Sequence, residues 1–490
     1  MNRQINRIKK CLATKLTVCF LAGVVATFSA NTIIAAAAAS QANSAQQTER
    51  AAVTGVRFSN APGKLRIVLD TNSAVAFTDT AKDNRIIIDA DAINRSPQSV
   101  FQSNDALVKS WSLSEPIKGK TRLEIKLSRQ AVYRTFVLPS PNRIVIDIIK
   151  DYREKVEYDF APGVHYTSWR EGMRAGPVWL HILTVDPNAG YLVRPVLAQD
   201  AIANGRESVS DMVSRTGAVA AVNASYFDTT GWIVGNLKMD GEIVSAEDRI
   251  RTAFSHFADG RYQVGQIHYE GRVVLPSGAE LPIGGVNRPR LDNEIVLYNQ
   301  YYGSSTGMKT GMEYSVKNER VETVNAKGDT ALAAGGYVLS AQGSAALQLA
   351  GVKPGQRLIV KGTLCGVEDK ADYVVGAGPL LVRQGSLALT TADEDFPADI
   401  AVGRAPRTAV GISKTGQIML VVVDGRQWNS IGLTLQELAE FMQSLGAQDA
   451  MNFDGGGSSE LVLKNDIMNT PSDGRERPVA SALAVFRTER

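Results

Sequence analysis

The residues best suited to chemistry in this chain lie near its end, in the segment Asn452-Phe-Asp-Gly-Gly-Gly-Ser-Ser459. This segment places the carboxylate of Asp454 beside three glycines, Gly455, Gly456 and Gly457, and two hydroxyls. Glycine is the costliest residue to order on folding, so three in a row indicate a sharp turn or a close approach to the backbone. Successive N–H groups in such a turn can form a nest for an anion. The pattern predicts an acid beside an anion site, suited to a phosphate ester. The alternative is a tight turn capped by the acid.

One helix and three strands must position this segment. Thr434 and Glu437 form a capping box that predicts the start of a helix. Its apolar residues recur at helical spacing, and Gly446 is expected to end it: Leu435, Leu438, Ala439, Met442 and Leu445. Upstream, 408–424 reads as two strands around a turn, and the second, 418–423, is apolar on both faces and therefore buried. The strand after the helix then delivers Asp454 at its end.

Other polar residues fall at expected strand ends and turns, where each has a structural alternative such as capping or solvation. They are Asn223, Asp228, Asp240, Arg251, Arg290, Glu313, Arg407, Asp424, Arg426 and Arg477. Asp240-Gly241 predicts a hairpin turn. We expect no cofactor. A structural divalent cation such as Ca²⁺ at 393–395 is the alternative to three solvated carboxylates. The four histidines have no His-x-x-x-His spacing, so no zinc site is predicted.

Length and composition describe a globular chain of 490 residues, for which two or three domains are expected. Residues 1–39 hold a basic start, an apolar core and a small-residue tail, which predict a signal peptide, with an uncleaved anchor as the alternative. Removing its five basic residues leaves 48 Lys and Arg against 50 Asp and Glu, so no general attraction to nucleic acid is expected. Nothing after Ala39 is apolar for long enough to span a membrane. Cys365 remains as the single mature cysteine, so no intramolecular disulfide is expected.

A polar linker is predicted over 40–52, followed by a repeated β pattern over 53–150. The run 119–127 repeats 63–70, and 142–147 repeats 84–89. Two copies of a small sheet, neither able to cover its apolar face alone, are expected to pack face to face as an all-β sandwich. The charged stretch 151–159 is then expected to bridge to a second domain.

The first domain resembles the AMIN domain of bacterial envelope proteins, through Val53-Thr-Gly-Val-Arg-Phe58 and the repeated Arg-Ile-Val/Ile-Leu/Ile-Asp runs. The resemblance implies a non-catalytic module that localises its partner to the cell wall or septum. A β-sandwich spacer without a ligand is the alternative.

The rest of the chain, 160–490, resembles the phosphodiester glycosidase family, which includes the catalytic domain of N-acetylglucosamine-1-phosphodiester α-N-acetylglucosaminidase. Seven motifs occur in order: 222–228, 287–290, 376–382, 407–411, 424–426, 432–439 and 451–459. The family usually has Leu where Phe453 stands. Its lysosomal member also carries disulfide-bonded modules that have no counterpart here, so the natural substrate of that member is not carried over to this chain. The fold expected is an N-terminal all-β sandwich followed by an α+β mixed-sheet catalytic domain.

The resemblance implies hydrolysis of the C1–O bond of a sugar-1-phosphodiester. A phosphate monoester leaves readily, so the enzyme must hold the phosphate charge, stabilise an oxocarbenium-like sugar and direct a water or carboxylate at C1. We expect Asp454 as the principal carboxylate and Asp424 as its partner. Guanidinium groups match phosphate bidentately, and the remaining groups of the site would bind phosphate or orient sugar hydroxyls: Arg407, Arg426, Arg290, Gly455, Gly456, Gly457, Asn223, Asn452 and Ser458. Which acid is base or nucleophile stays open.

The sequence thus predicts a hydrolase exported to the periplasm, cell wall or extracellular space, acting on a phosphodiester-linked envelope glycan and held to peptidoglycan by its first domain. A non-catalytic wall- or polysaccharide-binding protein is the main alternative. An ordinary exo-glycosidase is a third, although it gains little from the arginines.

Overall fold

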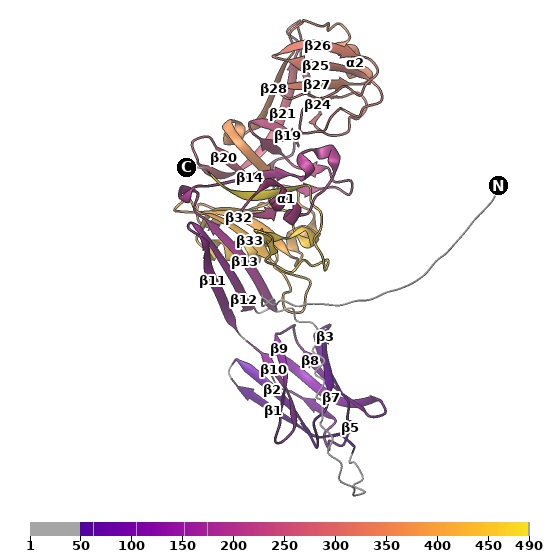
Figure 1. Cartoon of the computed structure of the whole chain (residues 1–490), viewed down its shortest axis with the longest axis vertical. Coiled ribbons are helices and arrows are strands. Elements are labelled where there is room, and N and C mark those ends of the chain that lie inside the picture. Colours follow the sequence, from indigo (N-terminus) through magenta and orange to yellow (C-terminus); the bar gives the residue numbers. More distant parts are fainter. Residues whose placement is uncertain (1–49, 62, 104, 151, 174, 489–490) are drawn as a thin grey trace, which may run out of the picture.

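The structure of the chain is a computed structural model that describes residues 50–488 except 62, 104, 151 and 174. The predicted signal sequence and most of the predicted linker lie outside these residues. The described chain forms an N-terminal β-sandwich, a central body of two sheets and a further β region, arranged along one long axis (Figure 1).

The N-terminal domain is a sandwich of two five-stranded sheets, as the all-β prediction requires. Their orders are β5-β1-β2-β10-β9 and β3-β4-β8-β7-β6. Inward-facing isoleucines such as Ile67, Ile88, Ile125 and Ile146 fill the core between them. The strands are β1 (Ala52–Ala61), β2 (Lys64–Thr71), β3 (Phe77–Lys82), β4 (Arg85–Ala90), β5 (Ile93–Asn94), β6 (Val100–Gln102), β7 (Val108–Ile117), β8 (Lys120–Leu127), β9 (Tyr133–Leu138) and β10 (Arg143–Ile149).

The two sequence repeats are interleaved, so the expectation of one sheet per repeat is wrong. Strand β2 of the first repeat pairs with β10 of the second, and β4 pairs with β8. The repeated charged residues meet across this pairing: Arg66 donates to Asp147 at 2.6 and 2.7 Å, and Arg122 donates to Asp89 at 2.7 Å twice. Each repeat thus supplies one half of both bidentate pairs, a match that a separate sheet could not make.

The central body packs two sheets around one core. An eight-stranded sheet has the order β11-β12-β13-β33-β32-β34-β30-β31, and a five-stranded sheet has the order β14-β37-β15-β35-β36. Leu183, Leu420, Met451 and Leu483 belong to the apolar cluster between them. The strands are β11 (Arg153–Ala161), β12 (Val164–Gly172), β13 (Pro177–Val185), β14 (Tyr191–Leu197), β15 (Ala220–Asn223), β30 (Leu380–Arg383), β31 (Ser386–Leu387), β32 (Arg407–Ser413), β33 (Ile418–Val423), β34 (Ala447–Asn452), β35 (Leu461–Leu463), β36 (Asp466–Ile467) and β37 (Ser481–Arg487).

The charged stretch expected to bridge the domains is largely the edge strand β11, which pairs with β12. The second domain's sheet therefore begins at Arg153, before the predicted boundary at Phe160. The hairpin predicted over 408–424 is confirmed as β32 and β33, and every residue of β33 is buried.

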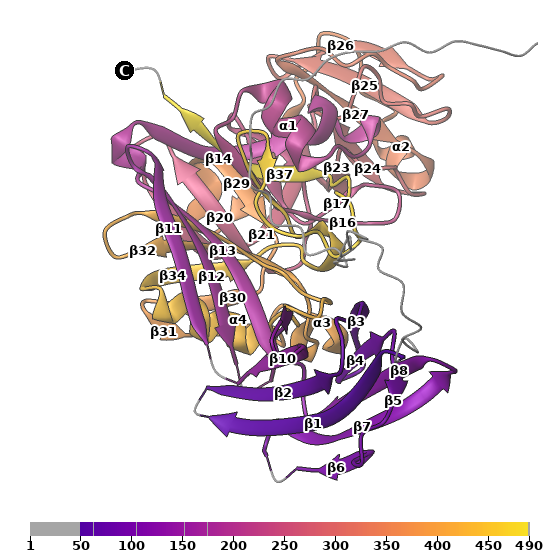
Figure 2. The same cartoon turned by 60° about the horizontal axis from the view of Figure 1, so that its bottom comes forward.

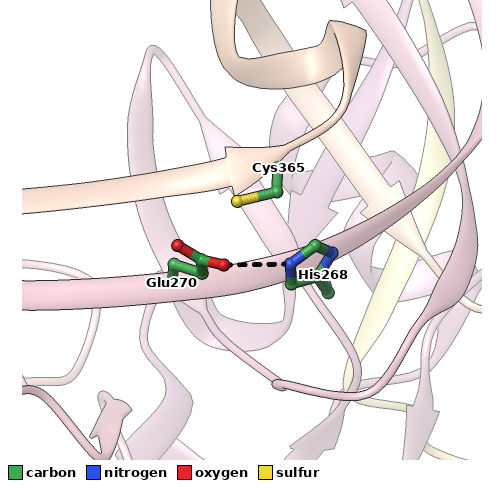
Figure 3. A group of neighbouring side chains, drawn as sticks. All are labelled: His268, Glu270 and Cys365. Carbon is green, nitrogen blue, oxygen red and sulfur yellow. Dashed lines mark hydrogen bonds and ion pairs between the residues drawn. The ribbon is translucent and has the colours of Figure 1, made fainter.

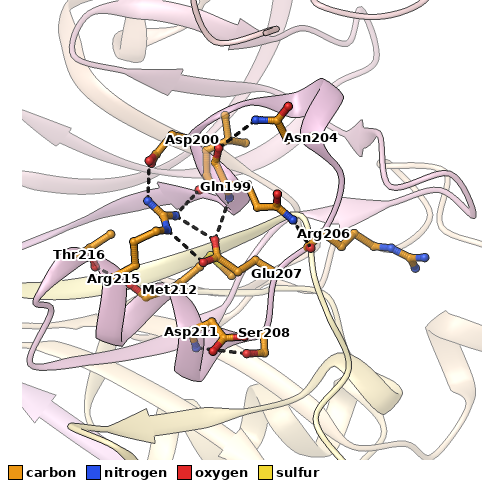
Figure 4. A network of polar contacts seen from close by, with 11 residues as sticks. Gln199, Asp200, Asn204, Arg206, Glu207, Ser208, Asp211, Met212, Arg215 and Thr216 are labelled. Atoms are coloured by element: carbon orange, nitrogen blue, oxygen red, sulfur yellow. Dashed lines mark hydrogen bonds and ion pairs between the residues drawn. The ribbon is translucent and has the colours of Figure 1, made fainter.

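Short helices cover the outer faces of both sheets. Helix α4 (Leu435–Ser444) has the predicted capping box and packs its apolar face on the eight-stranded sheet. Helix α1 (Val209–Thr216) packs on the five-stranded sheet. Arg215 holds α1 to the preceding loop by bonding Asp200 at 2.6 Å and Glu207 at 2.9 Å (Figure 4). The α-helices in the described residues are completed by α2 (Gly343–Leu349) and α3 (Ala398–Val402). Strands therefore dominate, and the mixed α+β expectation is met only in part.

A further β region extends the body (Figures 1 and 2). One sheet has the order β19-β18-β29-β20-β21-β22 with β28 paired to β21, and another has the order β23-β24-β27-β25-β26. The predicted turn at Asp240-Gly241 is confirmed between β18 and β19, with φ of 50° and 80°. The strands are β18 (Leu237–Met239), β19 (Glu242–Ser245), β20 (Arg251–Phe257), β21 (Tyr262–Val274), β22 (Glu280–Pro282), β23 (Gly285–Val286), β24 (Ile295–Tyr298), β25 (Met312–Lys317), β26 (Arg320–Asn325), β27 (Gly336–Ala341), β28 (Ile359–Cys365) and β29 (Ala371–Gly376); the hairpin β16 (Tyr226–Phe227) and β17 (Ile233–Val234) lies apart.

No helix among the described residues is long and apolar enough to cross a membrane.

Candidate active site

Asp454 lies where the two central sheets meet, directly after the buried strand β34. Its N–H donates to the carbonyl of Ala224 at 3.0 Å. Asn223, at the end of β15 in the other sheet, donates from Nδ2 to the carbonyl of Asp454 at 2.7 Å. The backbone of Asp454 is therefore fixed by both sheets, and its predicted place at a strand end is confirmed.

The Asp454 carboxylate is surrounded by protein but keeps a partly accessible side. Burial raises its pKa to about 6. Three groups act in the opposite direction: the Ser458 hydroxyl, which lies near without meeting hydrogen-bond geometry, the Gly455 N–H, which donates to Oδ1 at 2.8 Å, and Arg477. An acid with this pKa is present in both protonation states near neutral pH, which is what general acid–base chemistry requires.

The glycine turn is not the open nest that the sequence suggests. The N–H of Gly455 is used by Asp454, and the N–H of Gly456 donates to the Pro406 carbonyl at 2.9 Å. The N–H groups of Ser458 and Ser459 close a single 3-10 turn, η5 (Gly456–Ser458). Because these donors already have partners inside the protein, they cannot form an open nest for an anion.

The glycines instead admit two guanidinium groups. A Cβ added at Gly457 would lie 2.0 Å from Nη2 of Arg477, and one added at Gly456 would lie 3.2 Å from Nη2 of Arg426. Arg477 is paired with Asp473 at 2.6 Å. Arg426 is exposed, and within the described residues it makes no ion pair. A Cβ added at Gly457 would also lie 2.5 Å from Oδ2 of Asp473, so Arg477 lies against the turn as an ion pair, and Arg426 supplies the unpaired positive charge.

Arg407 has a different environment from that expected of a phosphate contact. It is only 4% exposed, and its guanidinium donates to the carbonyls of Leu433, Ile400 and Gly403 at 3.0, 3.1 and 2.5 Å. Burial lowers its pKa, and neighbouring Arg426 acts in the same direction. Through these bonds Arg407 holds the segment around α3 against the sheet.

Substitutions of Arg407 and Arg426 are expected to differ in their effect on the free energy of unfolding. Arg407→Ala leaves the partly buried carbonyls of Ile400 and Gly403 without this donor, while that of Leu433 keeps the Ala405 N–H, and it should lower the free energy of unfolding by about 3 kcal/mol. Arg426→Ala removes an exposed side chain and should change it by no more than about 0.5 kcal/mol. Urea unfolding of both variants checks the difference. Equal losses would contradict these assignments.

The amide side chains expected to orient sugar hydroxyls are mostly engaged within the protein. Asn223 Oδ1 accepts from Thr408 Oγ1 at 2.7 Å and from the Glu460 N–H at 3.1 Å, so its role is to position the turn. Asn452 donates to Tyr226 Oη at 2.9 Å, but its own Oδ1 is buried and has no hydrogen-bond partner. The hydroxyl of Ser458 is likewise buried without one. Ser459 Oγ and Glu460 Oε1 are further buried oxygens of this turn without a partner, so Asn452 Oδ1 and Ser458 Oγ are two of several acceptors open to a ligand.

Asp424 reaches the turn only through another side chain. Its Oδ1 accepts from the Thr470 N–H at 2.9 Å and from Asn469 Nδ2 at 3.3 Å, and Asn469 also donates to the Ser459 carbonyl at 3.0 Å. Its Oδ2 lies 3.6 Å from Nε2 of the fully buried His181. Such contacts suit a positioning group, and a direct role beside Asp454 stays a prediction.

Two other predicted features lie elsewhere. Arg290 bonds Ser340, the Thr310 carbonyl and Gln342, all in the β region of β23–β27. In the acidic run 393–395, Glu394 is buried and accepts from both the N–H and the hydroxyl of Thr252, at 2.8 and 2.5 Å. Its carboxylate therefore anchors β20, and the calcium alternative loses a ligand.

Two residues of this region were not singled out from the sequence. Tyr226 lies inside a matched motif, and burial together with Asp454 raises its pKa. Burial and neighbouring Glu476 raise the pKa of Glu460 to about 10, so it is a neutral acid directly after the turn. The motif 222–228 could have pointed to Tyr226. Glu460 opens an apolar run, and no pattern in the sequence around it points to a functional role.

Comparisons with known proteins match part of this chain to one family. A family model described as phosphodiester glycosidase matches residues 310–486, which include Asp424 and the whole 452–459 segment. The SPbeta prophage-derived uncharacterized protein YomE of Bacillus subtilis is 36% identical over 95 residues, 19% of this chain and 15% of that protein. Human N-acetylglucosamine-1-phosphodiester alpha-N-acetylglucosaminidase is 42% identical over 103 residues, 19% of this chain and 20% of that protein. The chain thus spans at most a fifth of either relative.

A crystal structure of a hypothetical protein from Synechocystis has a TM-score of 0.63 and 21% identity, covering 89% of this chain and 81% of that one, so it shares the fold. The family match does not reach residues 53–150, and the AMIN resemblance stays a prediction. Within 310–486 the resemblance predicted from the sequence is confirmed, and these residues form a domain of the phosphodiester glycosidase family.

Proposed function

We propose that this protein is an exported hydrolase that cleaves the C1–O bond of sugar-1-phosphodiesters in envelope or extracellular glycans. The observation that carries the proposal is the buried Asp454 carboxylate, whose pKa is about 6, beside a glycine turn that admits Arg426 and Arg477. This pairs a group able to act at C1 with positive charge for the departing phosphate.

In the proposed reaction the substrate phosphate lies against Arg426, with Arg477 completing the positive field. Ionised Asp454 either takes a proton from the attacking water or attacks C1 itself. The C1–O bond breaks, its oxygen stays with the phosphate monoester, and water supplies the new hydroxyl of the free sugar. Buried Asn452 Oδ1 and Ser458 Oγ, which lack protein partners, accept from sugar hydroxyls.

The test is to incubate the full chain with an N-acetylglucosamine-1-phospho-alkyl diester and identify the products. Free N-acetylglucosamine together with alkyl phosphate is expected. N-acetylglucosamine-1-phosphate would place the enzyme among phosphodiesterases, and cleavage of neutral glycosides alone would favour an ordinary exo-glycosidase. No turnover of any glycosyl phosphodiester would favour the non-catalytic alternative.

The N-terminal sandwich is proposed to hold the enzyme at the cell wall. Support comes from its AMIN-like motifs and from a core of its own, centred on residues such as Leu69, Trp111 and Ile144. Sedimentation with isolated peptidoglycan should retain the full chain. Equal retention of a chain lacking residues 53–150 would contradict this role.

A further inference from the structure

Three side chains that commonly bind metal ions gather outside the candidate active site. His268 and Glu270 lie on β21, and Cys365 ends the neighbouring strand β28 (Figure 3). One ligand atom from each of the three lies within 4.8 Å of the others, and His268 Nε2 is 3.3 Å from Glu270 Oε1. All three keep some exposure, so an ion from solvent can reach them.

The strand register fixes this arrangement. In the antiparallel pair of β21 and β28, His268 lies opposite Cys365 and Glu270 lies opposite Thr363. Opposed residues share a face, as do alternate residues along one strand, so all four side chains project from the same face. The ladder continues from this end to Val274 opposite Ile359. The three groups are therefore held by rigid backbone and not by a loop.

The surroundings of this cluster favour a cation. The Thr363 hydroxyl donates to Oδ1 of Asp369 at 2.6 Å and holds a second carboxylate nearby. The carboxylates of Glu270 and Asp369 thus place negative charge at this cluster, which favours a bound cation.

We propose that His268, Glu270 and Cys365 bind a divalent transition-metal ion, for which Zn²⁺ is the best chemical match. Zinc accepts thiolate sulfur, imidazole nitrogen and carboxylate oxygen together, whereas Ca²⁺ and Mg²⁺ prefer oxygen ligands throughout. On binding, the thiol proton passes to solvent and the thiolate takes its place at the metal. Three protein ligands leave one position of a tetrahedron for water or an exogenous ligand.

The cluster also borders a cavity. Glu270 is among the residues that line a cavity of about 710 Å³, together with Glu247, Arg272 and Arg288. A space that can hold a small molecule therefore adjoins Glu270, one of the three residues that would hold the ion. This metal site does not depend on the proposed glycosidase activity, because no ligand of the cluster belongs to the 452–459 turn.

The experiment uses the full chain after its signal sequence and any affinity tag are removed. Co²⁺ is titrated as a spectroscopic probe, and Zn²⁺ bound at equilibrium is counted after dialysis. We expect one ion per chain and a thiolate-to-cobalt charge-transfer band. Cys365→Ser should abolish the band, and His268→Ala and Glu270→Gln should weaken Zn²⁺ binding by roughly tenfold or more. Thr363→Val, which releases Asp369, should weaken it by about tenfold.

The matched control is His165→Ala, which breaks another exposed histidine–carboxylate pair, His165 with Asp159 at 2.8 Å, on a different sheet. This control should leave both readouts unchanged. Circular dichroism of every variant confirms that the fold is kept. The proposal is overturned if Co²⁺ gives no charge-transfer band, or if Zn²⁺ binding survives Cys365→Ser and His268→Ala. Equal weakening by His165→Ala would indicate adventitious surface binding only.

Discussion

Replacing Asp454 by asparagine is expected to lower turnover of a sugar-1-phosphodiester by roughly 10³-fold or more, because asparagine can neither accept a proton nor attack C1. The backbone bonds of this residue to Ala224 and Asn223 do not involve its carboxylate and should persist. In the parent protein kcat/KM should rise with pH through about 6, as Asp454 ionises. Single-turnover product release measured across this range checks both expectations.

A matched control lies on the strand that leads to Asp454. Asp449 on β34 forms an exposed ion pair with Arg383 at 3.3 Å, and Asp449→Asn should keep close to full activity. Retention of more than a tenth of kcat by Asp454→Asn would remove this carboxylate from the chemistry. Equal losses in both variants would point to a general effect on the sheet.

The position of the site could be predicted because it depends on local patterns. The capping box at Thr434, the doubly apolar strand 418–423 and the glycine turn each report on a few neighbouring residues. Together they place Asp454 at the end of a buried strand, as observed. The repeat in the first domain likewise predicted its strands.

The interactions of the individual residues could not be predicted, because they depend on contacts between distant segments. Whether Arg407 faces a ligand or the Leu433 carbonyl depends on how the segment around α3 packs on the sheet. The prediction of an open anion nest was wrong for the same reason, since the Gly456 N–H donates to the carbonyl of Pro406. The interleaving of the repeats also follows from long-range pairing between β2 and β10.

The cluster of His268, Glu270 and Cys365 could not be found from the spacing of residues in the sequence. The sequence search for a His-x-x-x-His pattern assumes ligands on one helix. His268 and Glu270 are alternate residues of a strand, and Cys365 joins them only through the β21–β28 register. Ligands shared across a sheet leave no fixed spacing in the sequence, so the absence of that pattern did not exclude a site.

Asp454→Asn, which is expected to lower turnover, is also expected to stabilise the protein at neutral pH. The pKa of Asp454 rises from its ordinary 3.8 to about 6 on folding, so the folded protein binds the proton more tightly than the unfolded chain. Well below pH 3.8 both states are protonated and burial of the carboxyl costs nothing through this charge. As pH rises towards 6 the folded state loses stability relative to the unfolded chain, and above 6 the full cost persists.

A two-unit shift corresponds to at most about 3 kcal/mol at pH 7, and to less where solvent reaches the carboxylate. Asp454→Asn removes this cost, so its free energy of unfolding should exceed that of the parent at pH 7, and the difference should vanish near pH 3. Urea unfolding at both pH values, with Asp449→Asn as the control, measures the difference. A gain that does not depend on pH would have another origin, and a loss at pH 7 would mean that the ionised carboxylate is stabilised where it lies. The same burial that destabilises the charge moves the pKa of Asp454 into the range in which a carboxylate exchanges a proton near neutral pH, as the proposed reaction requires.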